Sequence, residues 1–168
     1  MYDYQFSDDA VTAWMLLRRT SYAIHRIADR HLNEMHLTAE QVHALWLCRD
    51  YRGLVTPAEL SRLLFRESQT IAGLLARMER DGLVKRVPKQ RGHPFTEVKI
   101  TDKGEELCRA GLEKARTLIA ELMSPLSTEE LEQFKQLLRK LQQKAFEELR
   151  IELIPLPDYD CGEVDREH

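Results

Sequence analysis

The sequence predicts a mostly helical α+β protein in which a single β-hairpin interrupts a series of helices. Capping-box patterns mark helix starts, and apolar residues then recur at helical spacing. One basic stretch instead alternates as strands do. The 168 residues, 43% of them hydrophobic, suffice for a cored domain with long appendages.

A long first helix is predicted from about Asp8 to about Glu34. Its apolar and small residues step alternately by four and three positions, which is the spacing of a heptad stripe. The stripe consists of Ala10, Trp14, Leu17, Ser21, Ile24, Ala28, His31 and Met35. A small domain cannot cover so long a stripe, so we interpret this helix as part of an interface.

Three capping boxes predict further helix starts. In this pattern the first side chain accepts from a backbone amide three residues on, and the fourth side chain bonds back. The boxes are Thr38–Gln41, Thr56–Glu59 and Ser127–Glu130. We expect the next helices over about Thr38–Arg49, Thr56–Leu64 and Ser68–Asp81. Gly82 should end the last of these as its left-handed cap.

A β-hairpin follows, with arms at Leu83–Pro88 and Phe95–Ile100. Two long helices are then expected, over about Asp102–Met123 and Ser127–Glu152. Two prolines, at 155 and 157, should stop the second helix.

The net charge of −3 conceals an uneven distribution. Residues 151–168 hold six acids and one base, a net −5, so the other 150 residues carry +2. Between Gly82 and Lys99 five basic residues face one acid, a net +4. Local charge governs phosphate binding more than the total does, so the hairpin is a candidate nucleic-acid contact.

The third and fourth predicted helices form a helix-turn-helix around the turn Leu64–Ser68. The inward stripe of the fourth helix would be Ile71, Leu74, Leu75 and Met78, and its outward face Ser68, Gln69, Ala72, Gly73, Arg77 and Arg80. Gln can pair with adenine edges and Arg with guanine, while Ala and Gly permit close approach. The alternative is an ordinary amphipathic helix with a polar outer face.

The segment "TPAELSRLLFRESQTIAGLLARMERDGLVKR", followed by "VKITDKGEEL", resembles the MarR family of bacterial winged helix-turn-helix regulators. The resemblance covers roughly Leu37 to Leu107, and the long helices fit the family's dimerisation region in layout. The matching positions are Leu60, Leu64, Thr70, Leu74, Leu75, Glu79, Gly82, Leu83, Val84 and Arg86, with Thr101 and Gly104 after the hairpin.

The resemblance implies a homodimer that places its fourth helices in successive major grooves of a pseudo-palindromic site. The hairpin becomes a wing over the adjacent minor groove. Many such regulators are repressors released by small aromatic ligands, by cysteine oxidation or occasionally by metal. The expected DNA-binding residues are Arg66, Ser68, Gln69, Thr70, Ala72, Gly73, Arg77, Lys89, Arg91 and His93.

The wing departs from the family pattern. Lys89 stands where an Asp is common, and Gly92-His93-Pro94 replaces an Asp-Arg-Arg-like run. We expect Arg91 to enter the minor groove with Lys89 on a phosphate, and protonated His93 to contribute. The alternative is a solvated turn.

The implied organisation has four parts. They are an N-terminal dimerisation helix (1–36), a winged helix-turn-helix DNA-binding domain (37–101), C-terminal dimerisation helices (102–152) and an acidic flexible tail (153–168). We expect a ligand-responsive, sequence-specific repressor of double-stranded DNA; the alternative is a winged-helix module for protein–protein contact. Catalytic motifs, a signal peptide and a membrane span are absent from the sequence, so we expect a cytoplasmic protein that is not an enzyme.

Regulatory sites are less clearly marked. An effector pocket could be lined by Trp14, Tyr22, His25, His43 and Trp46, although for each of them an ordinary core position is the favoured interpretation. His25, His31, His36 and His43 are spaced by six, five and seven residues, which does not place them on one helical face, so we expect no metal or other cofactor. Cys48 and Cys108 should be buried structural thiols, whereas Cys161 lies in the tail and could be reactive.

Overall fold

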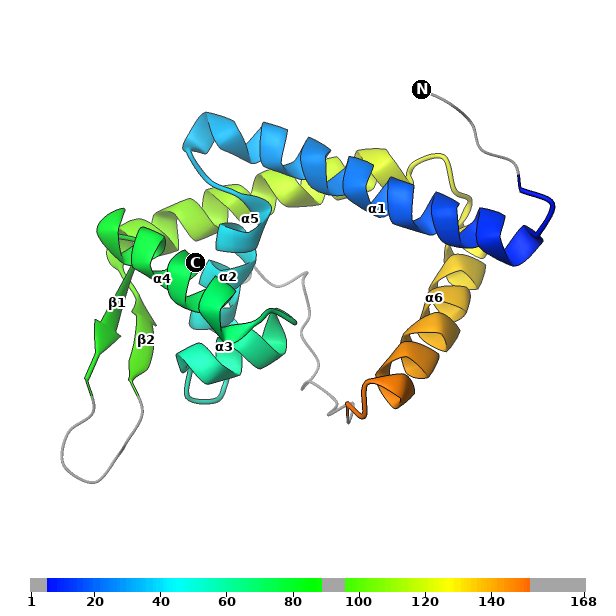
Figure 1. Cartoon of the computed structure of the whole chain (residues 1–168). Coiled ribbons are helices and arrows are strands. Elements are labelled where there is room, and N and C mark those ends of the chain that lie inside the picture. Colours follow the sequence, from blue (N-terminus) through cyan, green and yellow to red (C-terminus); the bar gives the residue numbers. More distant parts are fainter. Residues whose placement is uncertain (1–5, 89–95, 152–168) are drawn as a thin grey trace. The chain divides into compact units, whose positions relative to one another are not determined.

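The computed structural model describes residues 6–88 and 96–151 (Figure 1). Contacts divide the chain into two units, residues 1–121 and 122–168, and each is considered by itself. Within the described ranges, no helix combines the length and the apolar character needed to cross a membrane. The elements are α1 (Asp9–Leu32), the 3-10 helix η1 (Asn33–Met35), α2 (Ala39–Asp50), α3 (Pro57–Leu63), α4 (Ser68–Arg80), β1 (Val84–Val87), β2 (Glu97–Ile100), α5 (Asp102–Met123) and α6 (Thr128–Glu148).

The predicted fold class is confirmed, and two of the three capping boxes are complete. Thr38 accepts from the amide of Gln41 at 3.2 Å, and the Gln41 side chain accepts from the amide of Thr38 at 2.9 Å. Ser127 and Glu130 form the same reciprocal pair in α6.

The third box, at the start of α3, was predicted wrongly and is only half formed. Thr56 accepts from the amide of Glu59 at 3.1 Å. The Glu59 carboxylate does not return the bond, because it accepts instead from the Tyr51 hydroxyl and the Arg62 guanidinium. Arg62 lowers the pKa of Glu59 and so keeps this carboxylate charged.

A left-handed residue ends α4, as predicted. Gly82 has φ +73°, its amide donates to the carbonyl of Glu79 at 3.0 Å, and the Leu83 amide donates to Met78 at 2.8 Å. This Schellman arrangement satisfies carbonyls at the helix end and turns Leu83 into the core.

The same hydrogen-bond pattern closes three other helical segments with non-glycine residues, namely His36, Phe65 and Arg150, each at φ 55°. Arg150 corrects the prediction for α6. The amides of Arg150 and Ile151 donate back to Glu147 and Phe146, so the helix ends at Glu148, before either proline.

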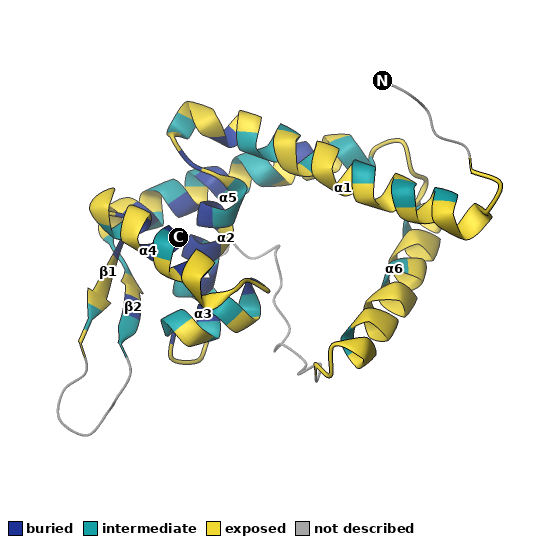
Figure 2. Cartoon of the chain, viewed as in Figure 1, coloured by how far each residue is buried: buried dark blue, intermediate teal, exposed yellow. Residues whose placement is uncertain are grey.

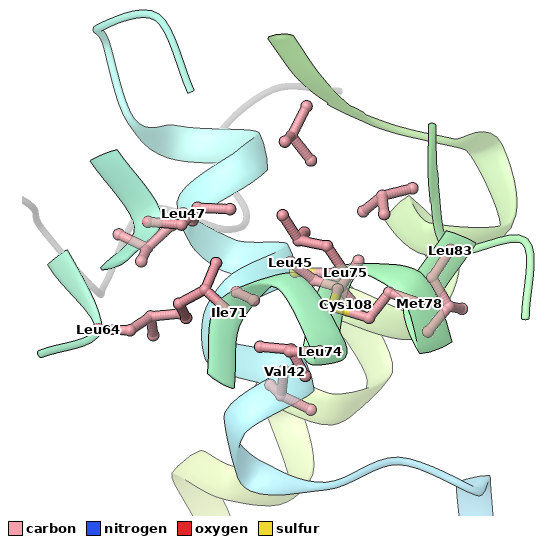
Figure 3. Close-up of a cluster of buried hydrophobic side chains, with 14 of the residues drawn as sticks. Val42, Leu45, Leu47, Leu64, Ile71, Leu74, Leu75, Met78, Leu83 and Cys108 are labelled. Carbon is pink, nitrogen blue, oxygen red and sulfur yellow. The ribbon is translucent and has the colours of Figure 1, made fainter. Parts of the chain in front are cut away.

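The core forms where α2, α4 and α5 meet (Figure 3). Ile71, Leu74, Leu75 and Met78 of α4 are at most 1% exposed, as the predicted inward stripe requires. They pack in one cluster with Val42 and Leu45 of α2, Leu64, Leu83 and Cys108. This burial fixes which face of α4 points outward.

The hairpin β1–β2 begins shortly after the C-terminal end of α4 and extends away from the core (Figure 1). The strands are antiparallel, with Val84 opposite Ile100 and Val87 opposite Glu97. The Val98 amide also donates to the carbonyl of Val55 at 2.8 Å. The loop before α3 thus anchors the base of the hairpin, a contact that the sequence did not predict.

Thr101 alone connects β2 to α5. Its hydroxyl donates to the carbonyl of Gly82 at 2.7 Å and accepts from the amide of Gly104 at 3.0 Å. Gly104 is buried so closely that a Cβ there would lie 2.1 Å from the carbonyl oxygen of Leu83. Helix α5 is therefore fastened directly onto the end of α4.

We predict that Gly104→Ala lowers the free energy of unfolding by about 1–3 kcal/mol or more, because the new methyl group must displace backbone. Urea denaturation followed by circular dichroism measures this. Lys103→Ala is the matched control, since it removes only an exposed side-chain bond to the carbonyl of Asp81. Equal stability of the two variants would contradict the close contact.

Candidate nucleic-acid interface

Helix α4 presents a polar face to solvent. Ser68, Gln69, Thr70, Ala72 and Arg77 are all exposed, and Gly73 is half-buried beside them. Figure 2 shows exposed residues running along α4 and β1. The predicted outward residues of this helix therefore lie together on one surface.

Two features of α4 suit an anionic partner. Its N-cap is Glu67, which makes no side-chain capping bond, so the first amides lack that partner. Arg77 forms no ion pair or side-chain hydrogen bond within the described part of the chain. Amides at a helix N-terminus and an unpaired guanidinium both favour phosphate or base acceptors.

Gly73 lies on this surface, and no contact among the described residues requires a glycine there. A Cβ at this position would meet only the Arg77 guanidinium, at an ordinary 3.6 Å. The backbone is helical, so alanine would fit and would favour the helix. A glycine that the fold does not require is expected where another molecule approaches the backbone closely.

Glu79 couples α4 to the hairpin. Its carboxylate accepts from the Arg86 amide at 3.1 Å and from the Arg86 Nε at 2.8 Å, with a further bond from the same guanidinium. Arg86 lowers the pKa of Glu79 and keeps the pair charged. Three bonds between one carboxylate and one arginine fix the direction in which β1 leaves the helix.

Arg66, in the turn before α4, is already partnered. Its Nε lies 2.7 Å from Oε1 of Glu40, in the first turn of α2. The remaining predicted DNA-binding residues, Lys89, Arg91 and His93, lie outside the described residues, as does Cys161. Of the adjacent strand residues, Lys85 is exposed and Lys99 pairs with Glu97 at 3.2 Å.

A largely apolar cavity of about 250 Å³ lies between α1, α2 and α5. Its walls include Val42, His43 and Trp46 of α2 and Leu118 of α5. The rings of His43 and Trp46 are 5.6 Å apart. Two of the five predicted effector-pocket residues therefore line this cavity.

The other three, Trp14, Tyr22 and His25, are exposed on α1 and are not among the residues that line it in the described part of the chain. Tyr22 lies beneath the Arg18 guanidinium at 5.6 Å, and His25 faces Asp29 at 3.4 Å. Both contacts run along the outer surface of one helix.

The polar groups of the cavity are few. Lys114 of α5 lines it and donates to the carbonyl of His31 at 3.2 Å and to the Glu34 carboxylate. Lys114 in turn lowers the pKa of Glu34. His43 lines the cavity but is exposed overall; its partial burial lowers the pKa of the imidazole, which favours the neutral form.

The cysteine and histidine positions support no further chemistry among the described residues. Cys108 is buried and Cys48 half-buried, and burial raises their pKa values to about 11 and about 12. Both are thus protonated at neutral pH and poor nucleophiles. The described residues include no group of three or more side chains arranged to hold a metal ion.

Three ion pairs near the candidate surfaces were not predicted from the sequence: Glu40–Arg66, Glu79–Arg86 and Glu34–Lys114. The members of the first and last pairs are 26 and 80 residues apart, so no helical spacing relates them. Glu79–Arg86 is closer in sequence, and its partners match the family pattern, but only the Schellman turn brings them together.

Comparison with known proteins identifies relatives of the chain. The family model described as the MarR family matches residues 37–93. The multiple antibiotic resistance protein MarR of Salmonella typhimurium is 28% identical over 130 residues, covering 74% of this chain and 90% of its own.

Solved structures share the fold. The DNA complex of S. aureus MepR has a TM-score of 0.72 and 27% identity, covering 82% of this chain and 99% of that one. The organohalide-sensing RdhR regulator bound to 2,4-dichlorophenol has a TM-score of 0.73 and 21% identity, covering 86% and 89%.

We predict that Gly73→Ala has opposite effects on folding and on DNA binding. The free energy of unfolding should rise by about 1 kcal/mol, because alanine favours helix. Affinity for cognate DNA should fall about tenfold, equivalent to ~1.4 kcal/mol, because the methyl group blocks close approach. Urea denaturation and fluorescence anisotropy measure the two quantities. Undiminished affinity would remove Gly73 from the interface.

Proposed function

We propose that this chain, whose residues 37–93 match the MarR family model, is a winged helix-turn-helix regulator of that family, a ligand-responsive repressor that binds a pseudo-palindromic operator as a homodimer. The family's members regulate transcription by binding DNA and are not enzymes. Operator recognition, dimerisation and effector response are each proposed from specific features of the chain.

The observation that carries the proposal is the exposed face of α4. Gln69 and Arg77 on this face can form hydrogen bonds with base edges. Ser68 and Thr70 can form hydrogen bonds with phosphate oxygens. The opposite face of the same helix is held rigidly in the core. A rigid helix with small residues at its centre fits a major groove better than a protein surface, where exposed aromatic residues would be expected.

The hairpin extends the proposed interface. Its arm β1 leaves α4 in a direction fixed by Glu79 and Arg86. We propose that Arg91 enters the minor groove, with Lys89 on a phosphate and protonated His93 contributing.

Homodimerisation is proposed from apolar side chains that the single chain leaves exposed. On α1, Trp14 is 62% exposed and Tyr22 59%. On α6, Leu137 is 59% exposed and Leu141 57%. Isolated exposed leucines are ordinary, but long helices with apolar stripes need a partner, and a second copy supplies one with matching symmetry.

An aromatic effector is proposed for the cavity beside α2. Its apolar wall, with His43 and the indole of Trp46, suits a small ring, and a phenolate or carboxylate would bind Lys114 by replacing its Glu34 partner. The relative RdhR was solved with 2,4-dichlorophenol, a ligand of this class. We do not assign Trp14, Tyr22 or His25 to this cavity.

DNA binding is tested by salt titration of the affinity for upstream genomic fragments. We predict two chains per duplex and an affinity that falls steeply with salt, because each neutralised phosphate releases a counterion. Arg77→Ala should cost ~1–3 kcal/mol of discrimination between operator and unrelated DNA, whereas Arg91→Ala should weaken binding without changing the melting temperature.

Absent or salt-independent DNA binding would instead favour a winged-helix module for protein contact. An unchanged affinity for Arg91→Ala would remove the tip from the interface. An exposed residue of α5, such as Arg109, provides a matched arginine-to-alanine control away from α4.

Effector binding is tested by tryptophan fluorescence. The chain has two tryptophans, so Trp14→Phe leaves Trp46 as the only reporter. We predict saturable quenching of this variant by 2,4-dichlorophenol, together with weaker DNA binding. Trp46→Phe, which leaves only the exposed Trp14, is the control. Equal quenching of both variants would argue against the cavity.

A further inference from the structure

The ion pair between Glu40 and Arg66 joins α2 to the turn that precedes α4. The Nε–Oε1 distance is 2.7 Å, across 26 residues of sequence. Arg66 lies two residues before Ser68, where α4 begins. An arginine at this point is close to the uncapped amides of the helix N-terminus, where a phosphate is favoured.

The backbone of Arg66 is fixed by hydrogen bonds, whereas its side chain is held by the Glu40 ion pair alone among the contacts of the described residues. Its amide donates to the carbonyl of Ser61 at 3.0 Å, and its own carbonyl accepts from the Ser61 hydroxyl. The side chain of Arg66 is 49% exposed, whereas that of Glu40 is only 24% exposed. The guanidinium can therefore change partners by side-chain rotation, while the carboxylate stays in place.

We propose that Glu40 competes with DNA for Arg66. In the free protein the carboxylate holds the guanidinium, and in the complex Arg66 transfers to a backbone phosphate beside the N-terminus of α4. Glu40 thereby restrains the affinity for phosphate backbone without touching DNA. The inference depends on the proposed DNA-binding function and adds to it a residue that positions Arg66.

Competition has a distinct thermodynamic signature. The same number of phosphates is neutralised with and without Glu40, so the counterion-release slope stays nearly the same. What changes is the free-energy cost of breaking the ion pair, and this cost exists only when both Glu40 and Arg66 are present. A purely structural role for Glu40 would act whether or not Arg66 is present.

The test uses Glu40→Gln, which keeps the side-chain shape and removes the charge. Affinity for a short duplex of arbitrary sequence should rise about two- to fivefold, in keeping with the weak strength of exposed ion pairs. The slope of log affinity against log salt should change by much less than about 0.9, the value for one phosphate contact, because Arg66 meets phosphate in both proteins. In an Arg66→Ala background the competition is absent. Glu40→Gln should then have only the effect of removing one negative charge.

Glu67→Gln is the matched control for the loss of one negative charge. Glu67 lies in the same turn, and its carboxylate makes no ion pair or hydrogen bond among the residues the structure describes. Its effect should be equal with and without Arg66, because it acts through general repulsion alone. The excess of the Glu40→Gln effect over this control measures the competition.

Two results would overturn the inference. One is that Glu40→Gln tightens binding equally in both backgrounds, which would make Glu40 an ordinary repelling charge. The other is that it weakens binding, which would mean that Glu40 orients Arg66 toward DNA. Glu40→Asp keeps the charge on a shorter side chain and should behave between wild type and Glu40→Gln; thermal melting of each variant checks folding.

Heparin separates this inference from the proposed function, because it offers anionic groups without base pairs. Wild-type protein that is retained by heparin but binds no operator counts against the proposed function alone. Stronger heparin retention of Glu40→Gln that requires Arg66 supports the competition even then. Retention that does not depend on Arg66, or no change in retention, refutes it.

Discussion

The burial of one face of α4 is the constraint on which the rest of the protein depends. Ile71, Leu74, Leu75 and Met78 occupy the centre of the core, so α4 cannot rotate about its axis without exposing them. Since a helix has one outer face when the other is buried, the direction of Gln69 and Arg77 follows from packing. The side chains that we propose to contact DNA are thus positioned by the buried hydrophobic residues on the opposite face of the helix.

Carboxylates perform a second level of positioning. Glu40 reaches the turn before α4, Glu79 reaches β1 after it, and Glu34 reaches the cavity lysine on α5. Exposed ion pairs contribute little to stability, so their value lies in direction. Each one holds a basic side chain in a fixed direction, beside the start of α4, on β1 or in the cavity wall.

The sequence predicted the helices, the hairpin and the inward stripe of α4, because these depend on local periodicity and caps. It predicted the end of α6 wrongly, because Arg150 adopts a left-handed conformation that side-chain type does not favour. The same limit applies to His36 and Phe65. The cavity was half predicted: His43 and Trp46 are close in sequence, whereas Lys114 and Leu118 join them only through tertiary packing of α5.

The single-residue connection at Thr101 has a mechanical consequence. Strand β2 and helix α5 share an almost rigid joint, because Thr101 and the buried Gly104 leave no slack between them. The 22 residues of α5 form a helix roughly 33 Å long, at about 1.5 Å per residue. Because the joint is rigid, a rotation of the hairpin by about 5° turns α5 with it and moves the far end of this helix by roughly 3 Å. A small change in the angle of the hairpin therefore corresponds to a large displacement at the other end of α5. In the reverse direction, a displacement of that end by a few ångströms corresponds to a rotation of the hairpin by only a few degrees.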